Sequence, residues 1–173
     1  EGDAISLAEA RTRTFARRKI FIVSTPTIAG ASAIEREYEA SDQRRYFVPC
    51  PHCNHPQWLR FEQLRWDKGQ PETAAYICES CDTAISEHHK TWMLERGEWR
   101  SMAQGKTAGF HLSSLYSPVG WRSWRDIAAA WEAAVNKESG SAAAIKTFKN
   151  TELGETWVEE GEAPDWQRLV ERR

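Results

Sequence analysis

Four cysteines form two Cys-x-x-Cys pairs, and the chain contains no other cysteine. They are Cys50 and Cys53 in the stretch FVPCPHCNH and Cys78 and Cys81 in YICESCD, with 24 residues between the two pairs. Two residues between ligands let a tight turn aim both sulfurs at one metal ion, at about 2.3 Å from zinc. This spacing predicts one structural zinc ion (Zn2+) held by all four thiolates.

The residues beside each pair favour the same interpretation. Pro51 stiffens the first turn, and Asn54 and Asp82 directly follow the second cysteine of each pair, where a left-handed backbone is often needed. Two such turns, each next to a β-prone segment, are typical of a zinc ribbon. Because four thiolates leave no open coordination position, the metal is expected to hold a small module together and to do no chemistry.

Other uses of the cysteines fit less well. Disulfides are typical of secreted proteins, and the sequence shows no secretory signal. A redox-active Cys-x-x-Cys would account for one pair but not for two matched ones. Four histidines are close enough in sequence to compete as ligands, and we expect them to be exposed or to support the cysteines: His52, His55, His88 and His89.

Composition places the chain among ordinary globular proteins. At 173 residues it is long enough for one domain or two small ones, and 40% hydrophobic residues exclude a disordered protein. The 23 basic and 25 acidic residues nearly cancel, so no overall positive field indicates nucleic-acid binding. No apolar run approaches the roughly 20 residues that span a bilayer, and no membrane partner is expected.

The segment before the cysteines has the pattern helix, strand, helix. Ser6 and Glu9 form a capping box that predicts a helix over residues 7–16. The apolar run 20–23 has no alternation, which is typical of a strand buried on both faces. Such a strand needs neighbours that this sequence does not supply, and the chain opens with EGDAIS and no Met. We therefore expect an internal piece of a longer protein.

A second capping box, Ser32 with Glu35, predicts the helix after this strand over residues 33–40. Short, aromatic, β-prone segments follow from Arg45 to about Arg100, together with a short helix within residues 86–97. The last third is helical. Its first helix has the cap Ser123–Asp126 and the apolar stripe Trp124, Ile127, Trp131 and Val135, and its second runs from Ser141 to Gly154. The fold class is therefore α+β, with a partial α/β unit, a four-cysteine ribbon-like β module and a helical linker.

Several long segments are low in degeneracy, among them EGDAISLAEARTRTF, KIFIVSTPT, SAIEREYEASDQRRYFVPCPHC, AGFHLSSLYSP and TFKNTELGETW. Through them the whole chain resembles the large subunit of tailed-phage DNA-packaging terminases of the lambda gpA type. In that family ATP hydrolysis moves DNA into a capsid, and a nuclease domain cuts the concatemer. The resemblance implies a parent ATPase and DNA endonuclease that needs ATP and Mg2+. It also implies double-stranded DNA, the small terminase subunit and the portal as partners, in the cytoplasm of a bacterial host.

The resemblance places the chain in the middle of that protein. The Walker A pattern is absent, EGDAIS resembles the segment just after Walker B, and GEAPDWQRLVERR resembles the segment just before the nuclease carboxylates. Residues 1–43 would then end the ATPase domain, 44–118 would be the zinc-ribbon connector, and 119–173 would be the helical linker to the nuclease domain. The chain alone is expected to lack a complete active site.

Within STPT, Ser24 and Thr25 are candidate catalytic residues of ATPase coupling. Hydroxyls at the carboxyl edge of a parallel strand point into the crevice where α/β proteins hold ligands. The resemblance implies that they respond to the γ-phosphate. The alternative is an ordinary turn, with Thr25 held extended before Pro26.

A different class of function is a nucleic-acid-binding zinc module without motor activity. The stretch QWLRFEQLRW interleaves aromatic rings with Arg60 and Arg65, which either stack and pair with nucleic acid or surround the ribbon's own core. The basic run Arg11–Lys19 is either a phosphate-binding surface or a solvated face. A third option is a docking site for the small subunit or portal. Glu159 and Glu160 are interpreted as part of a solvated linker, and His111 as packed or hydrogen-bonded.

Overall fold

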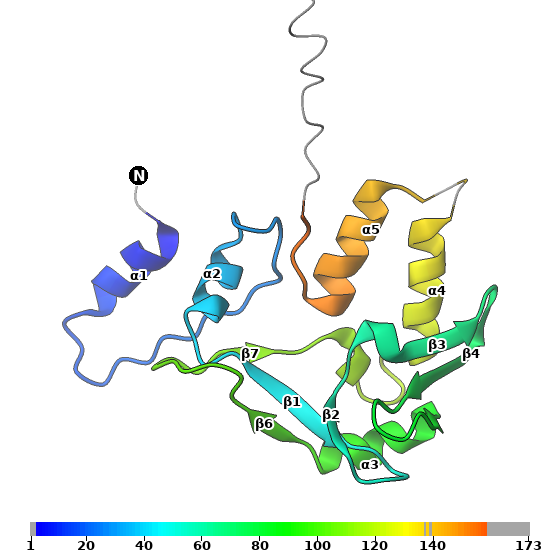
Figure 1. The fold of residues 1–173 in the computed structure, drawn as a ribbon. Helices are drawn as coiled ribbons and strands as arrows, with labels where there is room; N and C mark the ends of the chain where they lie inside the picture. The colour runs from blue at the N-terminus through cyan, green and yellow to red at the C-terminus, as the bar shows by residue number, and fades with distance from the viewer. Residues whose placement is uncertain (1–2, 137, 139, 159–173) are drawn as a thin grey trace, which may run out of the picture.

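The computed structural model describes residues 3–136, 138 and 140–158, and these form an α+β fold (Figure 1). Along the chain, two small sheets follow an N-terminal pair of helices and precede a C-terminal pair, and this α+β class agrees with the prediction. The helices are α1 (Ala4–Thr12), α2 (Ala33–Glu39), α3 (Lys90–Glu95), α4 (Trp124–Val135) and α5 (Ala142–Phe148). Within the described residues, no helix is both long and apolar enough to cross a bilayer.

The first sheet is built around one central strand. β1 pairs antiparallel with β2 and β6 and parallel with β7. The strands are β1 (Arg44–Pro49), β2 (Pro56–Trp58), β6 (Glu98–Arg100) and β7 (Phe110–His111). Tyr46 of β1 packs on Trp99 of β6, with ring centroids 5.0 Å apart, and its hydroxyl donates to Leu94 O over 2.7 Å. Tyr46 therefore joins this sheet to α3.

The second sheet has three antiparallel strands in sequence order: β3 (Leu64–Asp67), β4 (Gln70–Ile77) and β5 (Ala84–Ile85). Gly69, with φ of 78°, turns the chain between β3 and β4. Single 3-10 turns connect the strands and helices, at Phe61–Gln63, Glu87–His89 and Ser114–Tyr116. The turn at Glu87–His89 leads straight into α3, so the short helix predicted within residues 86–97 is confirmed.

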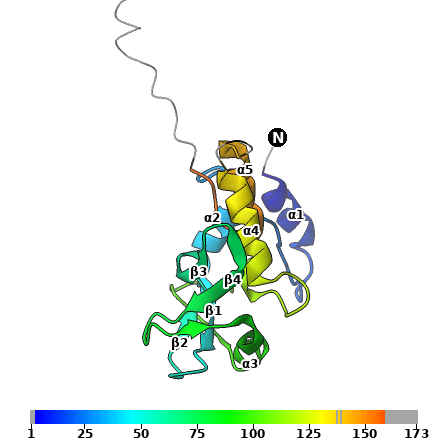
Figure 2. The ribbon, with the colours of Figure 1, turned by 90° about the vertical axis from the view of Figure 1, so that its right-hand side faces the viewer.

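One hydrophobic core joins both sheets to α4. Its fully buried side chains include Val48, Leu64, Tyr76, Ile85, Met93, Leu115, Trp124 and Ile127. Tyr116 connects the parts through its hydroxyl, which donates to Tyr46 O (2.7 Å) and accepts from Leu59 N (2.6 Å). The helix α4 lies against β4 of the second sheet, as Figure 2 also shows.

The C-terminal helices follow the sequence closely. Ser123 and Asp126 form the predicted capping box at the start of α4. The predicted apolar stripe is buried at Trp124 and Ile127, but Val135 at the end of α4 is 41% exposed. α5 continues as a π-helix, Lys149–Leu153, and the helical segment ends at Gly154, as predicted. Gly154 has a left-handed backbone conformation.

The predicted N-terminal cap of α1 is wrong. The N-cap is Asp3, whose carboxylate accepts from Ser6 N (3.3 Å), and the helix ends at Thr12 rather than at residue 16. The capping box proposed for α2 is also wrong, although its helix is confirmed. Ser32 Oγ accepts from Thr27 N (3.3 Å), and Glu35 accepts from Gly30 N (2.8 Å). At α1, the Asp3 carboxylate caps the helix one turn earlier than predicted. At α2, backbone N–H groups of the preceding turn bond to the side chains of Ser32 and Glu35 and so keep them from capping the helix.

The strand predicted over residues 20–23 does not form, and this part of the prediction is wrong. Phe21 and Val23 are 86% and 79% exposed. A strand is stabilised by hydrogen bonds to a neighbour, and no strand of the described chain lies beside this segment. The nearest pairing is an isolated parallel bridge, in which Trp157 N donates to Thr27 O and Ala29 N donates to Trp157 O, both over 2.9 Å.

His111 of β7 connects α2 to the C-terminal segment, which confirms that it is packed and hydrogen-bonded. Its Nε2 lies 3.0 Å from Gly154 O, and its ring lies 6.1 Å from that of Tyr38 in α2. Burial disfavours the charged imidazolium, and Arg45 lies nearby, so the pKa of His111 is lowered to about 4.

This lowered pKa predicts an acid-sensitive contribution to stability. The unfolded chain, with a His pKa of about 6.5, binds more protons between pH 6.5 and 4. The stability from neutral His111 is therefore present above about pH 6.5 and lost as pH falls toward 4. His111→Gln keeps a donor for Gly154 but does not titrate. We expect the difference in unfolding free energy, wild type minus variant, to fall by about 1–3 kcal/mol from pH 7 to pH 4 in urea titrations. A difference independent of pH contradicts this.

Candidate metal centre

Each cysteine pair lies in the turn of a β-hairpin. Cys50 and Cys53 lie between β1 and β2, and three hydrogen bonds donated by backbone N–H groups close the first turn. His52 N donates to Cys50 Sγ (3.4 Å), Asn54 N donates to Cys50 O (2.9 Å), and Cys50 N donates to His55 O (2.9 Å). These bonds aim the Cys50 sulfur inward and fix the turn around it.

The turn between β4 and β5 repeats this pattern position for position. Ser80 N donates to Cys78 Sγ (3.4 Å), Asp82 N donates to Cys78 O (3.1 Å), and Cys78 N donates to Thr83 O (3.1 Å). Asp82 has φ of 53° and its counterpart Asn54 has φ of 59°, so both adopt the left-handed backbone predicted from the sequence. The two turns are thus the same local structure built twice.

The four sulfur atoms converge where the two turns meet. All lie within 4.8 Å of one another, with Cys50 Sγ 3.9 Å from Cys81 Sγ and Cys53 Sγ 3.8 Å from Cys78 Sγ. A tetrahedron with metal–sulfur bonds of about 2.3 Å has edges of about 3.8 Å. The cysteines are free thiols, too far apart for disulfides. The quartet could therefore hold one metal ion.

The thiols differ strongly in acidity. Burial raises the pKa of Cys50 to about 12 and also raises that of Cys78, whereas hydrogen bonding with Thr83 lowers the pKa of Cys81 to about 6. A cation at the centre would stabilise the thiolate form of every member.

Side chains of residues 55–60 contact the second turn. Gln57, fully buried in β2, accepts from the backbone N–H of Glu79 through Oε1 (3.0 Å). The Glu79 carboxylate accepts from Arg60 Nη2 (2.6 Å) and lies 3.1 Å from His55 Nε2. We call Gln57, Glu79, Arg60 and His55 the clamp. The sequence analysis missed Gln57 and Glu79, although a glutamine within a core strand could have suggested a buried polar contact.

The other histidines form a separate cluster on the surface. The rings of His52 and His89 lie 5.6 Å apart and those of His88 and His89 lie 3.9 Å apart, and Ser86 Oγ lies 2.7 Å from His88 Nδ1. Within the described part of the chain, the cysteine quartet is the group whose ligand atoms converge with metal-binding spacing. These three histidines therefore lie beside the candidate centre without completing a ligand set.

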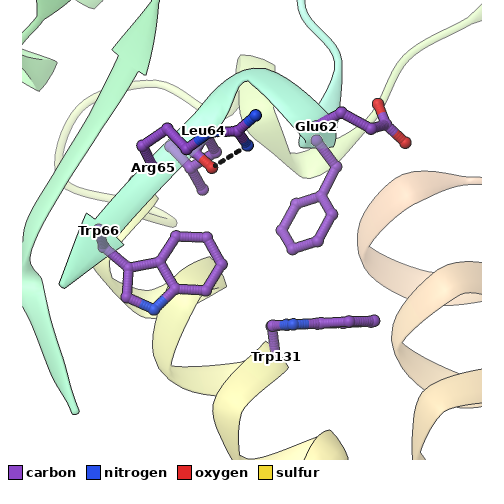
Figure 3. A pocket seen from close by; sticks show the side chains of 6 residues that line it. Glu62, Leu64, Arg65, Trp66 and Trp131 are labelled. Carbon is purple, nitrogen blue, oxygen red and sulfur yellow. Dashed lines mark hydrogen bonds between the residues drawn. The ribbon is translucent and has the colours of Figure 1, made fainter. Parts of the chain in front are cut away.

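The predicted nucleic-acid residues are divided between two places. Phe61, Arg65 and Trp66 line an open pocket together with Trp131 of α4 (Figure 3). Within the pocket, Phe61 and Trp131 are 5.2 Å apart by ring centroids, and Trp66 Nε1 donates to Glu132 Oε1 over 3.0 Å. The role of Trp131 here was not foreseen, because its contacts come from packing between distant segments.

Arg60 lies elsewhere, with its guanidinium 5.5 Å from the Trp58 ring and paired with Glu79 in the clamp. Arg65 is exposed, and its Nη1 donates to Leu64 O over 3.4 Å. Ser24 and Thr25 are exposed on the extended segment outside both sheets, where Ser24 Oγ donates to Thr25 O (3.2 Å). The structure therefore does not bring these candidates together into one site. The predicted linker acids Glu159 and Glu160 lie outside the described residues.

Comparisons with known proteins agree on one family. The family model of the phage terminase large subunit gpA ATPase domain matches residues 1–99. The family model of the terminase large subunit gpA endonuclease domain matches residues 107–173. The chain is 32% identical to the terminase large subunit of Enterobacteria phage P21 and 30% identical to that of Escherichia phage lambda. These alignments cover 99% and 100% of the chain but 30% of each relative. No solved structure matches the chain.

The clamp predicts that Glu79 supports metal binding without being a ligand. Glu79→Ala removes the contacts to Arg60 and His55 and leaves the second turn less fixed. We expect about tenfold weaker metal affinity, the usual effect of losing a residue that orients metal ligands. The measurement is Co2+ titration of the whole chain against a competing chelator. The control is Glu72→Ala, an exposed carboxylate on β4. Equal affinities in the two variants would contradict the role of the clamp.

Proposed function

We propose, because the chain belongs to the phage terminase large subunit gpA family, that its cysteine module is a structural zinc connector between the ATPase and endonuclease parts of a DNA-packaging motor. The observation behind this proposal is the pair of equivalent turns that converge four sulfurs at tetrahedral spacing. Zinc suits this set, because it prefers four-coordinate tetrahedral sites and thiolate ligands.

The connector role is supported by contacts between the two matched regions. Both cysteine hairpins lie within residues 1–99, whereas α4 and α5 lie within residues 107–173. Tyr76 of β4 packs on Trp124 of α4, with ring centroids 5.8 Å apart, and Trp66 of β3 bonds to Glu132 of α4. The zinc-braced hairpin is therefore the surface on which the endonuclease side of the chain rests.

In this proposal residues 1–43 end the ATPase domain, 44–118 form the module, and 119–173 lead to the nuclease domain. The whole protein hydrolyses ATP with Mg2+, cuts and packages double-stranded DNA, and works with the small terminase subunit and the portal in the host cytoplasm. Ser24 and Thr25 contribute to ATPase coupling. The chain spans about 30% of the length of its curated relatives, and these activities belong to the complete protein.

The zinc assignment predicts one zinc ion per chain, with Cys53 as a ligand and the neighbouring His52 as a bystander. Cys53→Ser is expected to lower zinc content to well below half an ion per chain and to expose the hairpins to proteolysis. His52→Ser, in the same turn, is expected to keep the full zinc content. The measurement is elemental analysis of the purified chain, before and after chelation. Full zinc content in Cys53→Ser, or a metal-free chain that stays folded, would contradict the zinc assignment.

The connector role predicts a separation of activities. The chain alone is expected to hydrolyse no ATP, because its sequence contains no Walker A pattern. In a complete large subunit, Cys53→Ser is expected to reduce packaged DNA at least tenfold, since the joint between the two catalytic parts loses its brace. His52→Ser serves as the control. Normal packaging by the cysteine variant, measured as nuclease-protected DNA, contradicts the connector role.

A further inference from the structure

One segment of the chain carries a dense and unneutralised positive charge. Residues 11–19, which we call the basic segment, hold five basic residues and no acidic residue, in a chain of formal net charge −2. The five are Arg11, Arg13, Arg17, Arg18 and Lys19, and all are exposed. None forms an ion pair with any residue that the structure describes. By contrast, carboxylates pair with many arginines elsewhere, including Arg36, Arg44, Arg60, Arg100 and Arg122.

The backbone of the basic segment spreads these charges over a loop. α1 ends at Thr12, and two turns follow, closed by Phe15 N donating to Thr12 O (3.0 Å) and Arg18 N donating to Phe15 O (3.4 Å). Phe15 itself is 66% exposed. The loop thus presents several guanidinium groups to solvent without packing them against the rest of the protein.

Ordinary structural roles do not account for this charge. A cation in the last turn of a helix interacts favourably with the helix dipole, which explains Arg11 in α1. Arg13, the C-cap of α1, shares this role, whereas Arg17, Arg18 and Lys19 lie beyond the helix, where their like charges repel one another. Such a cluster is suited to a polyanion that neutralises it.

We propose that the basic segment binds the phosphate backbone of double-stranded DNA independently of sequence. The choice of DNA rests on the proposed function, in which the parent protein acts on DNA. An anionic membrane is the competing polyanion. However, helices that lie on membranes separate an apolar face from a charged face, and α1 shows little such separation.

The test compares two triple variants of the zinc-loaded chain that lose the same charge. One carries Arg13→Gln, Arg17→Gln and Arg18→Gln. The control carries Lys68→Gln, Lys106→Gln and Arg125→Gln, which replace exposed cations elsewhere. Affinity for a short duplex is measured by fluorescence anisotropy from about 50 to about 200 mM salt. Circular dichroism and zinc content verify that both variants fold.

The expected result is quantitative, because each neutralised phosphate contributes about −0.9 to the slope of log affinity against log salt. The wild-type slope should approach about −4, and the basic-segment variant should be less steep by up to about 2.7, with at least tenfold weaker binding. The control should resemble the wild type. Equal losses in both variants, no duplex binding at low salt, or binding of phosphatidylserine vesicles instead of DNA each overturn the inference. A zinc-loaded chain that does not bind DNA overturns this inference alone and leaves the connector role intact.

Discussion

The convergence of four sulfur atoms is the constraint on which the rest of the structure depends. Two hairpins that are distant in sequence meet at their turns, and Cys50 and Cys78 are fully buried there. Two short hairpins bury too little apolar surface to hold this arrangement by themselves. A cation bound by the four thiolates would supply the missing attraction, because it would draw both turns to one point. The strands behind each turn are then fixed in position.

A short series of contacts connects the cysteine turns to α4. β4 leads into the second turn and presents Tyr76 to Trp124 of α4, and the indole N–H of Trp124 donates to Leu115 O over 3.0 Å. Lys90, fully buried in α3, pairs with Glu87, which in turn accepts from the backbone N–H of Trp124. The start of α4 is therefore held from several sides. A metal ion bound by the quartet would in this way help to determine the position of α4.

Sequence reasoning succeeded at several local features, although it misassigned the caps of α1 and α2. The left-handed residues Asn54 and Asp82 and the capping box at Ser123 each depend on atoms within five positions of the chain. It failed at the strand over residues 20–23, because a strand requires a partner that no local pattern specifies. The contact of Gln57 with Glu79, and that of Phe61 with Trp131, likewise arise only when separate segments pack together. The ligand types of the candidate centre were thus predictable, but the residues that orient them were not.

The bridge between Ile28 and Trp157 closes the chain from residue 28 to residue 157 into one large loop. A segment matched by the ATPase domain and one matched by the endonuclease domain are tied together directly, while the cysteine hairpins lie on the long arc between them. Tension applied across the two tied segments would load this bridge in shear before it reached the hairpins. The hairpins, with any metal ion they bind, would bear the load only after this bridge opens.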